Sequence, residues 1–194
     1  MLYKMYLKTF LLVTVITVSI FSQEVLSKDN YSTASASFLG LSYETVFKKK
    51  HGVALAGGAS YWNKNLNYEI GLHYNNYFNK KSMKRKKTGK IIGTKLQNWG
   101  PSIKFLSTEN TYPDENNNKY DYSAQYLCVG LHYGKKRIFN PGITVDTRIG
   151  YGVPIEVTEF KWRYNKPEKN AKIVEKITHV FSGLIGGVYV GYSF

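Results

Sequence analysis

A regular alternation of apolar residues with small or polar ones is the feature that most constrains this chain. From Ile143 to Ile155 apolar side chains occupy almost every second position, and residues such as Thr144 and Gly150 fall between them. Successive side chains of a β-strand point to opposite faces, so this spacing predicts strands with one apolar face. The alternation recurs in seven clear segments: Leu39–Phe47, Val53–Tyr61, Leu66–Phe78, Trp99–Phe105, Leu127–Tyr133, Ile143–Ile155 and Leu184–Phe194.

An eighth strand is needed if both ends of the chain lie on the same side of a membrane, because consecutive antiparallel strands alternate in direction. Two segments compete for this place, Tyr31–Phe38 and the short run FKWRY at Phe160–Tyr164, and the sequence favours neither. No long helical pattern appears after residue 25, and no repeat or linker divides the chain. We therefore predict one all-β domain.

The N-terminus has the layout of a secretory signal peptide. Lys4 and Lys8 precede an apolar run, Phe10–Phe21, which is shorter than the roughly 20 residues that a membrane-spanning helix needs. We expect residues 1–22 to be the signal peptide and residues 23–194 to form the mature domain. An exported chain does not meet the chromosome, so the formal charge of +14 indicates an anionic membrane surface and not a nucleic acid.

The residues opposite the apolar faces distinguish a sheet in water from a barrel in lipid. In a water-soluble sandwich those positions carry outward-facing polar residues, but here they are mostly Gly, Ala, Ser and Asn. Small side chains suit the crowded inside of a narrow barrel. Aromatic residues near strand ends, such as Tyr77 with Phe78 and Tyr192 with Phe194, are typical of the interfacial girdles of membrane barrels. The predicted fold is an eight-stranded antiparallel up-and-down transmembrane β-barrel.

At this point the sequence resembles a known class of protein. The signal peptide, the amphipathic strands and the final YVGYSF resemble the small outer-membrane β-barrels of Gram-negative bacteria, the OmpA/OmpX-type class. The segments SYETVFKKKHGVALAGGASYW, GLHYNNYFNKK and GLHYGKKRIFNPGITVDTRIGYG are similar to barrel domains of unassigned function in that class. The resemblance implies an outer-membrane location. It also implies that Tyr192 and Phe194 form a signal for the outer-membrane assembly machinery.

The small-residue faces also place ionisable side chains inside the predicted barrel. The lumen of an eight-stranded barrel is just wide enough for side chains to fill, and an unpaired ion there is costly. We therefore predict a polar network in which Arg148 and Lys104 pair with Glu44, Glu69 and Asp146. The predicted lumen residues are Glu44, Glu69, His73, Lys104, His132, Asp146 and Arg148. Simple filling of the lumen is one interpretation of this network, and a catalytic or gating role is the alternative.

Basic residues gather in three connections that a meander brings to one end of the barrel. They are Lys48, Lys49, Lys50, Lys80, Lys81, Lys84, Arg85, Lys86, Lys87, Lys90, Lys135, Lys136 and Arg137. We expect this cationic collar to contact lipid head groups, with the acidic TENTYPDENNN at the other end. If FKWRY is a loop, the collar is periplasmic and meets phospholipid; if it is a strand, the collar faces outward and meets lipopolysaccharide. We expect the periplasmic side, because tight turns usually lie there.

The predicted function is a structural or surface role in the cell envelope, with a filled lumen, no catalysis and no cofactor. One alternative is a lipid A-modifying enzyme, but its nearest candidate pair, His179 and Ser182, would point to opposite faces of a strand. A narrow channel or small-ligand carrier is the other alternative. No histidine has a metal-ligand spacing, and the single cysteine, Cys128, has no partner in the chain. Outer-membrane lipids are the expected partners, and the oligomeric state stays open.

Overall fold

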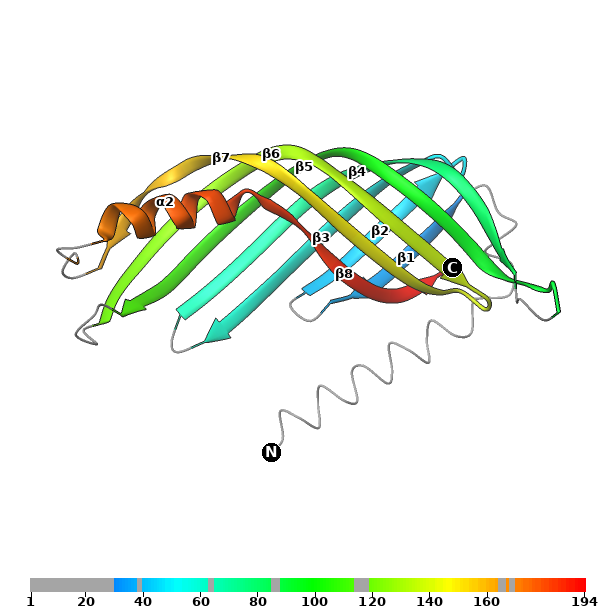
Figure 1. Cartoon of the computed structure of the whole chain (residues 1–194), viewed down its shortest axis with the longest axis horizontal. Coiled ribbons are helices and arrows are strands. Elements are labelled where there is room, and N and C mark those ends of the chain that lie inside the picture. Colours follow the sequence, from blue (N-terminus) through cyan, green and yellow to red (C-terminus); the bar gives the residue numbers. More distant parts are fainter. Residues whose placement is uncertain are drawn as a thin grey trace, which may run out of the picture.

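The computed structural model describes residues 30–37, 40–62, 65–84, 88–113, 119–163, 167 and 170–194. The predicted signal peptide, residues 1–22, lies outside these ranges. The described part forms eight strands and one helix, labelled as in Figure 1: β1 Tyr31–Ala36, β2 Gly40–Phe47, β3 His51–Trp62, β4 Asn65–Lys84, β5 Ile91–Pro113, β6 Lys119–Phe139, β7 Ile143–Trp162, α2 Ala171–Ser182 and β8 Leu184–Ser193.

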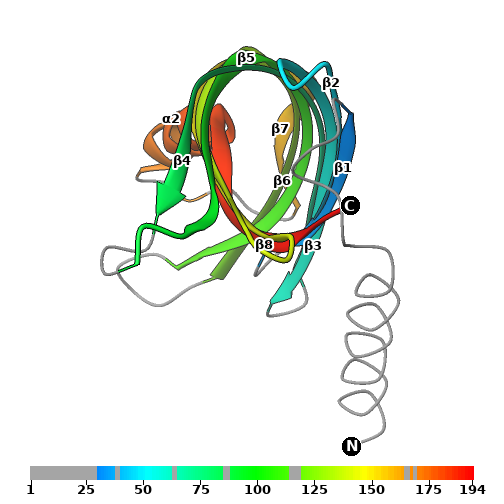
Figure 2. The same ribbon diagram turned by 90° about the vertical axis from the view of Figure 1, so that its right-hand side faces the viewer.

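Each strand pairs antiparallel with the next, and β8 pairs back with β1, so that the sheet closes into a barrel. Figure 2 looks along the barrel axis and shows the strands as a ring. The closing register places Thr33 opposite Ser193 and Ala36 opposite Val190. Ser32 and Phe194 then exchange two backbone hydrogen bonds of 2.9 Å. The prediction of an all-β fold with eight antiparallel up-and-down strands is confirmed.

The structure also decides between the two candidates for the eighth strand. Tyr31–Ala36 is a separate strand, β1, which pairs with β2 on one side and β8 on the other. FKWRY is not a strand of its own, because Phe160 to Trp162 form the last residues of β7. An even number of strands brings Tyr31 and Ser193 to the same end of the barrel, which we call the terminal end.

The helix α2 corrects the expectation that no helix follows residue 25. It covers 12 residues, and its apolar residues Ile173, Ile177 and Phe181 recur every fourth position. That period is typical of a helix and not of a strand. Gly183 ends the helix, since its N–H bonds back to the Val180 carbonyl at 3.2 Å, and β8 begins directly afterwards.

The strands differ greatly in length, which gives the barrel an uneven far end opposite the terminal end. β1 and β2 have 6 and 8 residues, whereas β5, β6 and β7 have 23, 21 and 20. At the far end the long strands extend past the short ones, and α2 lies along this extension (Figure 1). The ladder between β7 and β8 stops at Tyr151 opposite Leu184. Beyond that pair, α2 and not a strand runs beside β7.

The two faces of the wall have opposite chemical character. On β7 the outward side chains Ile149 and Val153 are 71% and 68% exposed, while the inward side chains Thr144 and Asp146 are buried. The other strands from β2 onward repeat this arrangement, with exposed apolar residues that include Leu41, Leu55, Leu72, Ile103, Leu131 and Val188. The outer face of the barrel is therefore largely apolar, whereas most of the buried polar side chains lie on the inner face.

Candidate functional site

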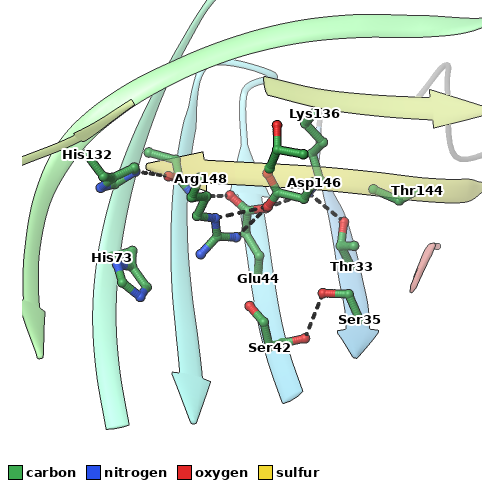
Figure 3. A network of polar contacts seen from close by, with 12 residues as sticks. Thr33, Ser35, Ser42, Glu44, His73, His132, Lys136, Thr144, Asp146 and Arg148 are labelled. Atoms are coloured by element: carbon green, nitrogen blue, oxygen red, sulfur yellow. Dashed lines mark hydrogen bonds and ion pairs between the residues drawn. The ribbon is translucent and has the colours of Figure 1, made fainter. Parts of the chain in front are cut away.

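The candidate site is the interior of the barrel, where buried polar side chains from different strands meet (Figure 3). Glu44 of β2 and Lys136 of β6 form an ion pair there, with both side chains buried. Glu44 Oε1 also accepts hydrogen bonds from Tyr77 OH at 2.6 Å and Asn75 Nδ2 at 2.5 Å. Lys136 Nζ donates to Thr33 Oγ1 at 2.8 Å. Each charge thus has several partners, which a buried ion requires.

Lys136 corrects the predicted collar. The prediction places it at the rim beside Lys135 and Arg137, but its side chain is fully buried. The physical reason is strand parity: β6 continues to Phe139, and Lys136 lies in phase with the inward residues Cys128 and His132. The alternation of β6 is visible in the sequence as far as Tyr133, and extending it by three residues would have identified Lys136 as a lumen residue.

A chain of hydrogen bonds joins Glu44 to two histidines. Because Asn75 donates its amide to Glu44, its Oδ1 accepts from His132 Nε2 at 2.7 Å. In neutral His132 the other ring nitrogen, Nδ1, is then an acceptor. It accepts a hydrogen bond from the Ser102 hydroxyl at 2.7 Å. Ser102 Oγ in turn accepts from His73 Nδ1 at 2.8 Å. Each hydrogen bond of this chain is therefore donated in the direction from His73 toward Glu44, and the chain links residues of four strands.

A second buried ion pair lies on β7. Arg148 donates from Nε and Nη2 to Asp146 Oδ2 at 3.0 and 2.6 Å, and both side chains are buried. The guanidinium group also lies over the ring of Tyr189, 5.5 Å from its centroid. Residues two apart on a strand share a face, so this pair follows from the spacing of the two residues.

Lys104 of β5 has two partners near the start of β8. Its Nζ donates to the Leu184 carbonyl at 2.5 Å and lies 3.7 Å from Glu69 Oε2. Of the seven predicted lumen residues, Glu69 differs in being partly exposed, with 44% of its side chain accessible. The sequence also predicts Glu44 as an acidic partner of Arg148 or Lys104, but the ion pair of Glu44 is with Lys136.

An apolar cluster fills the barrel toward the terminal end. It consists of the buried side chains Tyr31, Val46, Tyr77, Leu96 and Ile138, and Phe194 packs against it. Tyr77 therefore does not belong to an outward aromatic girdle, as the sequence suggested, because it lies on the inward face of β4. Phe194 likewise lies against the cluster, whereas Tyr192 remains at the surface and donates to the Pro141 carbonyl at 2.5 Å.

A cavity inside the barrel is lined by Glu69, His73, Lys104, Arg148 and Tyr189 and has room for about one water molecule. Toward the far end, Tyr126 and Cys128 are buried against Phe160. Side chains thus fill the interior around Tyr77, around Glu44 and around Tyr126.

The remaining basic collar lies at the terminal end, because the β2–β3, β4–β5 and β6–β7 connections all lie there. Lys48, Lys50, Lys80, Lys81, Lys84, Lys90, Lys135 and Arg137 are exposed, and Lys49 is partly exposed. Arg85, Lys86 and Lys87 lie outside the described residues. The part of the acidic segment that is described, at the end of β5, lies at the far end.

The candidate catalytic pair does not form. His179 and Ser182 lie one turn apart on α2, and the Ser182 hydroxyl donates to the His179 carbonyl at 2.7 Å instead of to its ring. Ser102 does contact a histidine ring, but it is only 1% exposed and lies inside the network. Within the described ranges, no group of His, Cys, Asp and Glu side chains is arranged to hold a metal ion.

Three comparisons with known proteins gave no relative. No family model, curated protein or solved structure matches this chain. Among the residues that the structure describes, no helix is long and apolar enough to cross a membrane.

Proposed function

We propose that this protein is exported and spans the outer membrane of a Gram-negative cell as a β-barrel with a structural or surface role. One observation carries the proposal: the outward face of the closed sheet is apolar, and the inward face holds the ion pairs and hydrogen bonds. Ile149, Val153 and Leu131, for example, are 71%, 68% and 59% exposed. Exposed apolar area costs about 25 cal/mol per Å² in water, and contact with lipid removes that cost.

The closed sheet supports the same location. Lipid offers no hydrogen-bond partner to the backbone, so a sheet in a membrane must have no free edge along its spanning part. Here β1 and β8 close the ring through four ladder pairs and the two bonds between Ser32 and Phe194. The outward apolar rows on β2 to β8 then face acyl chains, as is typical of transmembrane barrels.

A filled interior favours a structural role over a diffusion pore. The apolar cluster around Tyr77 and the network around Glu44 occupy the path between the two ends. Their packing and hydrogen bonds hold the strands together, so we assign the lumen residues to barrel stability. We propose no chemistry at Ser102, because its hydroxyl is buried in the network.

The basic collar and the C-terminus give the proposed orientation and partners. The start of β1, the end of β8 and the collar share one end, and we place this end on the periplasmic side, where the lysines contact anionic phospholipid head groups. Tyr192 and Phe194 serve as the signal for the assembly machinery before β8 closes on β1. Protease treatment of intact cells tests the orientation: cleavage between Lys80 and Lys90 from outside would place the collar on the cell surface.

Membrane fractionation followed by gel electrophoresis tests the proposal directly. We expect the protein in the outer-membrane fraction, extractable only with detergent. We also expect the unboiled protein to migrate differently from the boiled one, because a closed barrel resists unfolding by the detergent of the gel. A mature chain that is monodisperse in buffer without detergent would overturn the proposal.

A further inference from the structure

The orientation of α2 is set by contacts with the extended parts of β6 and β7. Trp162 Nε1 donates to Glu175 Oε1 at 3.1 Å, and Thr178 Oγ1 donates to Tyr122 OH at 3.3 Å. At the other end of the helix, the Cys128 thiol donates to the Ser182 carbonyl at 3.1 Å. The helix thus attaches to the barrel through these polar contacts and through the buried side chains of Ala171 and Val174.

The opposite side of α2 is apolar and has no protein against it in the described structure. Ile173, Ile177, Val180 and Phe181 are 55%, 50%, 46% and 63% exposed. A helix on the surface of a water-soluble protein buries its apolar stripe and exposes its polar side. α2 buries Ala171 and Val174 but leaves Ile173, Ile177, Val180 and Phe181 exposed, which indicates that the medium around this side of the helix is itself apolar.

The apolar face of α2 also continues the outer face of the barrel. Leu184, the first residue of β8, is exposed in the same outward row as Val188 and Val190. At the junction the Gly152 N–H donates to the Gly183 carbonyl at 2.8 Å, so the C-terminal end of α2 meets β7 next to the Tyr151–Leu184 pair of the β7–β8 ladder. Figure 1 shows α2 and β8 as one path along the wall, with α2 in the place of a strand.

We propose that α2 is a lipid-contacting part of the barrel wall, with the acyl chains of the membrane against Ile173, Ile177, Val180 and Phe181. This inference rests on the proposed membrane location. His179 lies 3.5 Å from Glu156, and Glu175 lies beside Trp162. In chain direction, the helix therefore runs antiparallel to β7, from the polar end of β7 toward the apolar stretch of β7. Phe181 is accordingly the deeper contact, and Ile173 lies nearer the head groups.

The charged flank of α2 agrees with this placement. Lys172 and Lys176 are exposed beside the apolar face. Long lysine side chains near an apolar surface extend their ammonium groups toward water and lipid phosphates. The helix therefore has the basic flank and apolar stripe of an interfacial helix, held in position by β6 and β7.

Spin labels on single introduced cysteines test the proposal in the intact protein. The protein is purified from membranes and reconstituted in vesicles of phosphatidylcholine with phosphatidylglycerol. The variants are Phe181→Cys and Ile177→Cys on the apolar face, Lys176→Cys as the matched control on the same helix, and Ile149→Cys on the outer face of β7. The native Cys128 is buried and stays in place. The parent protein, treated with the same spin label, is the control for reaction at Cys128, and we expect it to remain unlabelled.

Collision with oxygen, which dissolves in lipid, is compared with collision with a water-soluble nickel chelate. We expect oxygen to broaden the spectra of labels at Phe181, Ile177 and Ile149 more than nickel does, and the reverse at Lys176. If Ile149 prefers oxygen but Phe181 and Ile177 prefer nickel, the inference about α2 fails while the membrane location stands. If Ile149 prefers nickel, the membrane location itself fails. Labels at Phe181 and Ile177 that neither reagent reaches would show a protein partner on this face, which also overturns the inference.

Discussion

The inward and outward rows of β7 lie on the same strand but differ in what their side chains contact. Asp146 and Arg148 point inward, pair with each other and are buried. Ile149 and Val153 point outward and contact no partner that would shield them, at 71% and 68% exposure. The charges of the inward row pair with each other inside the protein, whereas the outward row needs a medium that the protein does not supply. The two rows therefore predict different responses to substitution.

The largest effect is expected where an inward charge loses its partner. Lys136→Met leaves Glu44 buried and without its cation, and breaking a buried pair in this way costs about 3–5 kcal/mol. The measurement is the free energy of unfolding in urea of the reconstituted protein, with the gel shift as a second readout. Lys135→Met, one residue away on the exposed side of β6, is the matched control and should change little.

The double variant Glu44→Gln with Lys136→Met separates the lost pair from lost packing. It removes both charges, so much of the stability lost in Lys136→Met should return. Equal destabilisation by Lys136→Met and Lys135→Met would contradict an interior ion pair.

The next effect concerns the outward row and depends on the medium. In the proposed membrane location, Ile149→Lys places a charge against acyl chains, at a cost of about 2–4 kcal/mol near the middle of a bilayer. In water the same exposed substitution would change stability by about 0.5 kcal/mol or less. Unfolding in vesicles measures the difference, with Glu159→Lys, which is exposed further along the same strand, as the control. A neutral Ile149→Lys would show that this face meets water.

A smaller inward effect is expected from the hydrogen-bond chain. Ser102→Ala removes the donor to His132 Nδ1 and the acceptor for His73 Nδ1. Leaving buried polar atoms unpaired costs about 1–3 kcal/mol. Ser82→Ala, on the exposed part of β4, is the control, and unfolding in urea is again the measurement. If both variants unfold at the same urea concentration, the hydrogen-bond chain through Ser102 contributes nothing to the stability of the barrel.

The same two rows explain how much the sequence could predict. Alternation identifies the strands and their faces, because a period of two is fixed by strand geometry. The same alternation correctly assigns Glu44, His73 and His132 to the inside. It misses Lys136 when the run of three basic residues is interpreted as a turn, although the parity of Lys136 places it inward. The pairing of Glu44 with Lys136 depends on register across the barrel, which no local pattern contains.

The helix α2 escapes prediction for a different reason. Its 12 residues lie between two strands, and the alternation on both sides outweighs the spacing of Ile173, Ile177 and Phe181. What fixes α2 is tertiary: β8 begins only at Leu184, so beyond Tyr151 the edge of β7 that faces away from β6 has no strand beside it, and polar contacts with Tyr122 and Trp162 hold a helix there. Those contacts join segments that are separated in the sequence.

The smallest predicted effect concerns the basic collar at the terminal end, which we propose to contact lipid head groups through its charges. Each collar lysine near an anionic surface contributes about 1 kcal/mol of attraction. Unfolding of the parent in vesicles with phosphatidylglycerol, compared with pure phosphatidylcholine, measures that gain. Lys80→Glu with Lys81→Glu should reduce the gain, and Lys80→Arg with Lys81→Arg should keep it. High salt should abolish the gain in the parent, because exposed charges are screened. If the extra stability in phosphatidylglycerol vesicles survives both the charge reversal and the high salt, the collar does not contact lipid head groups. The collar would then be a solvated surface, in contrast to the outward rows.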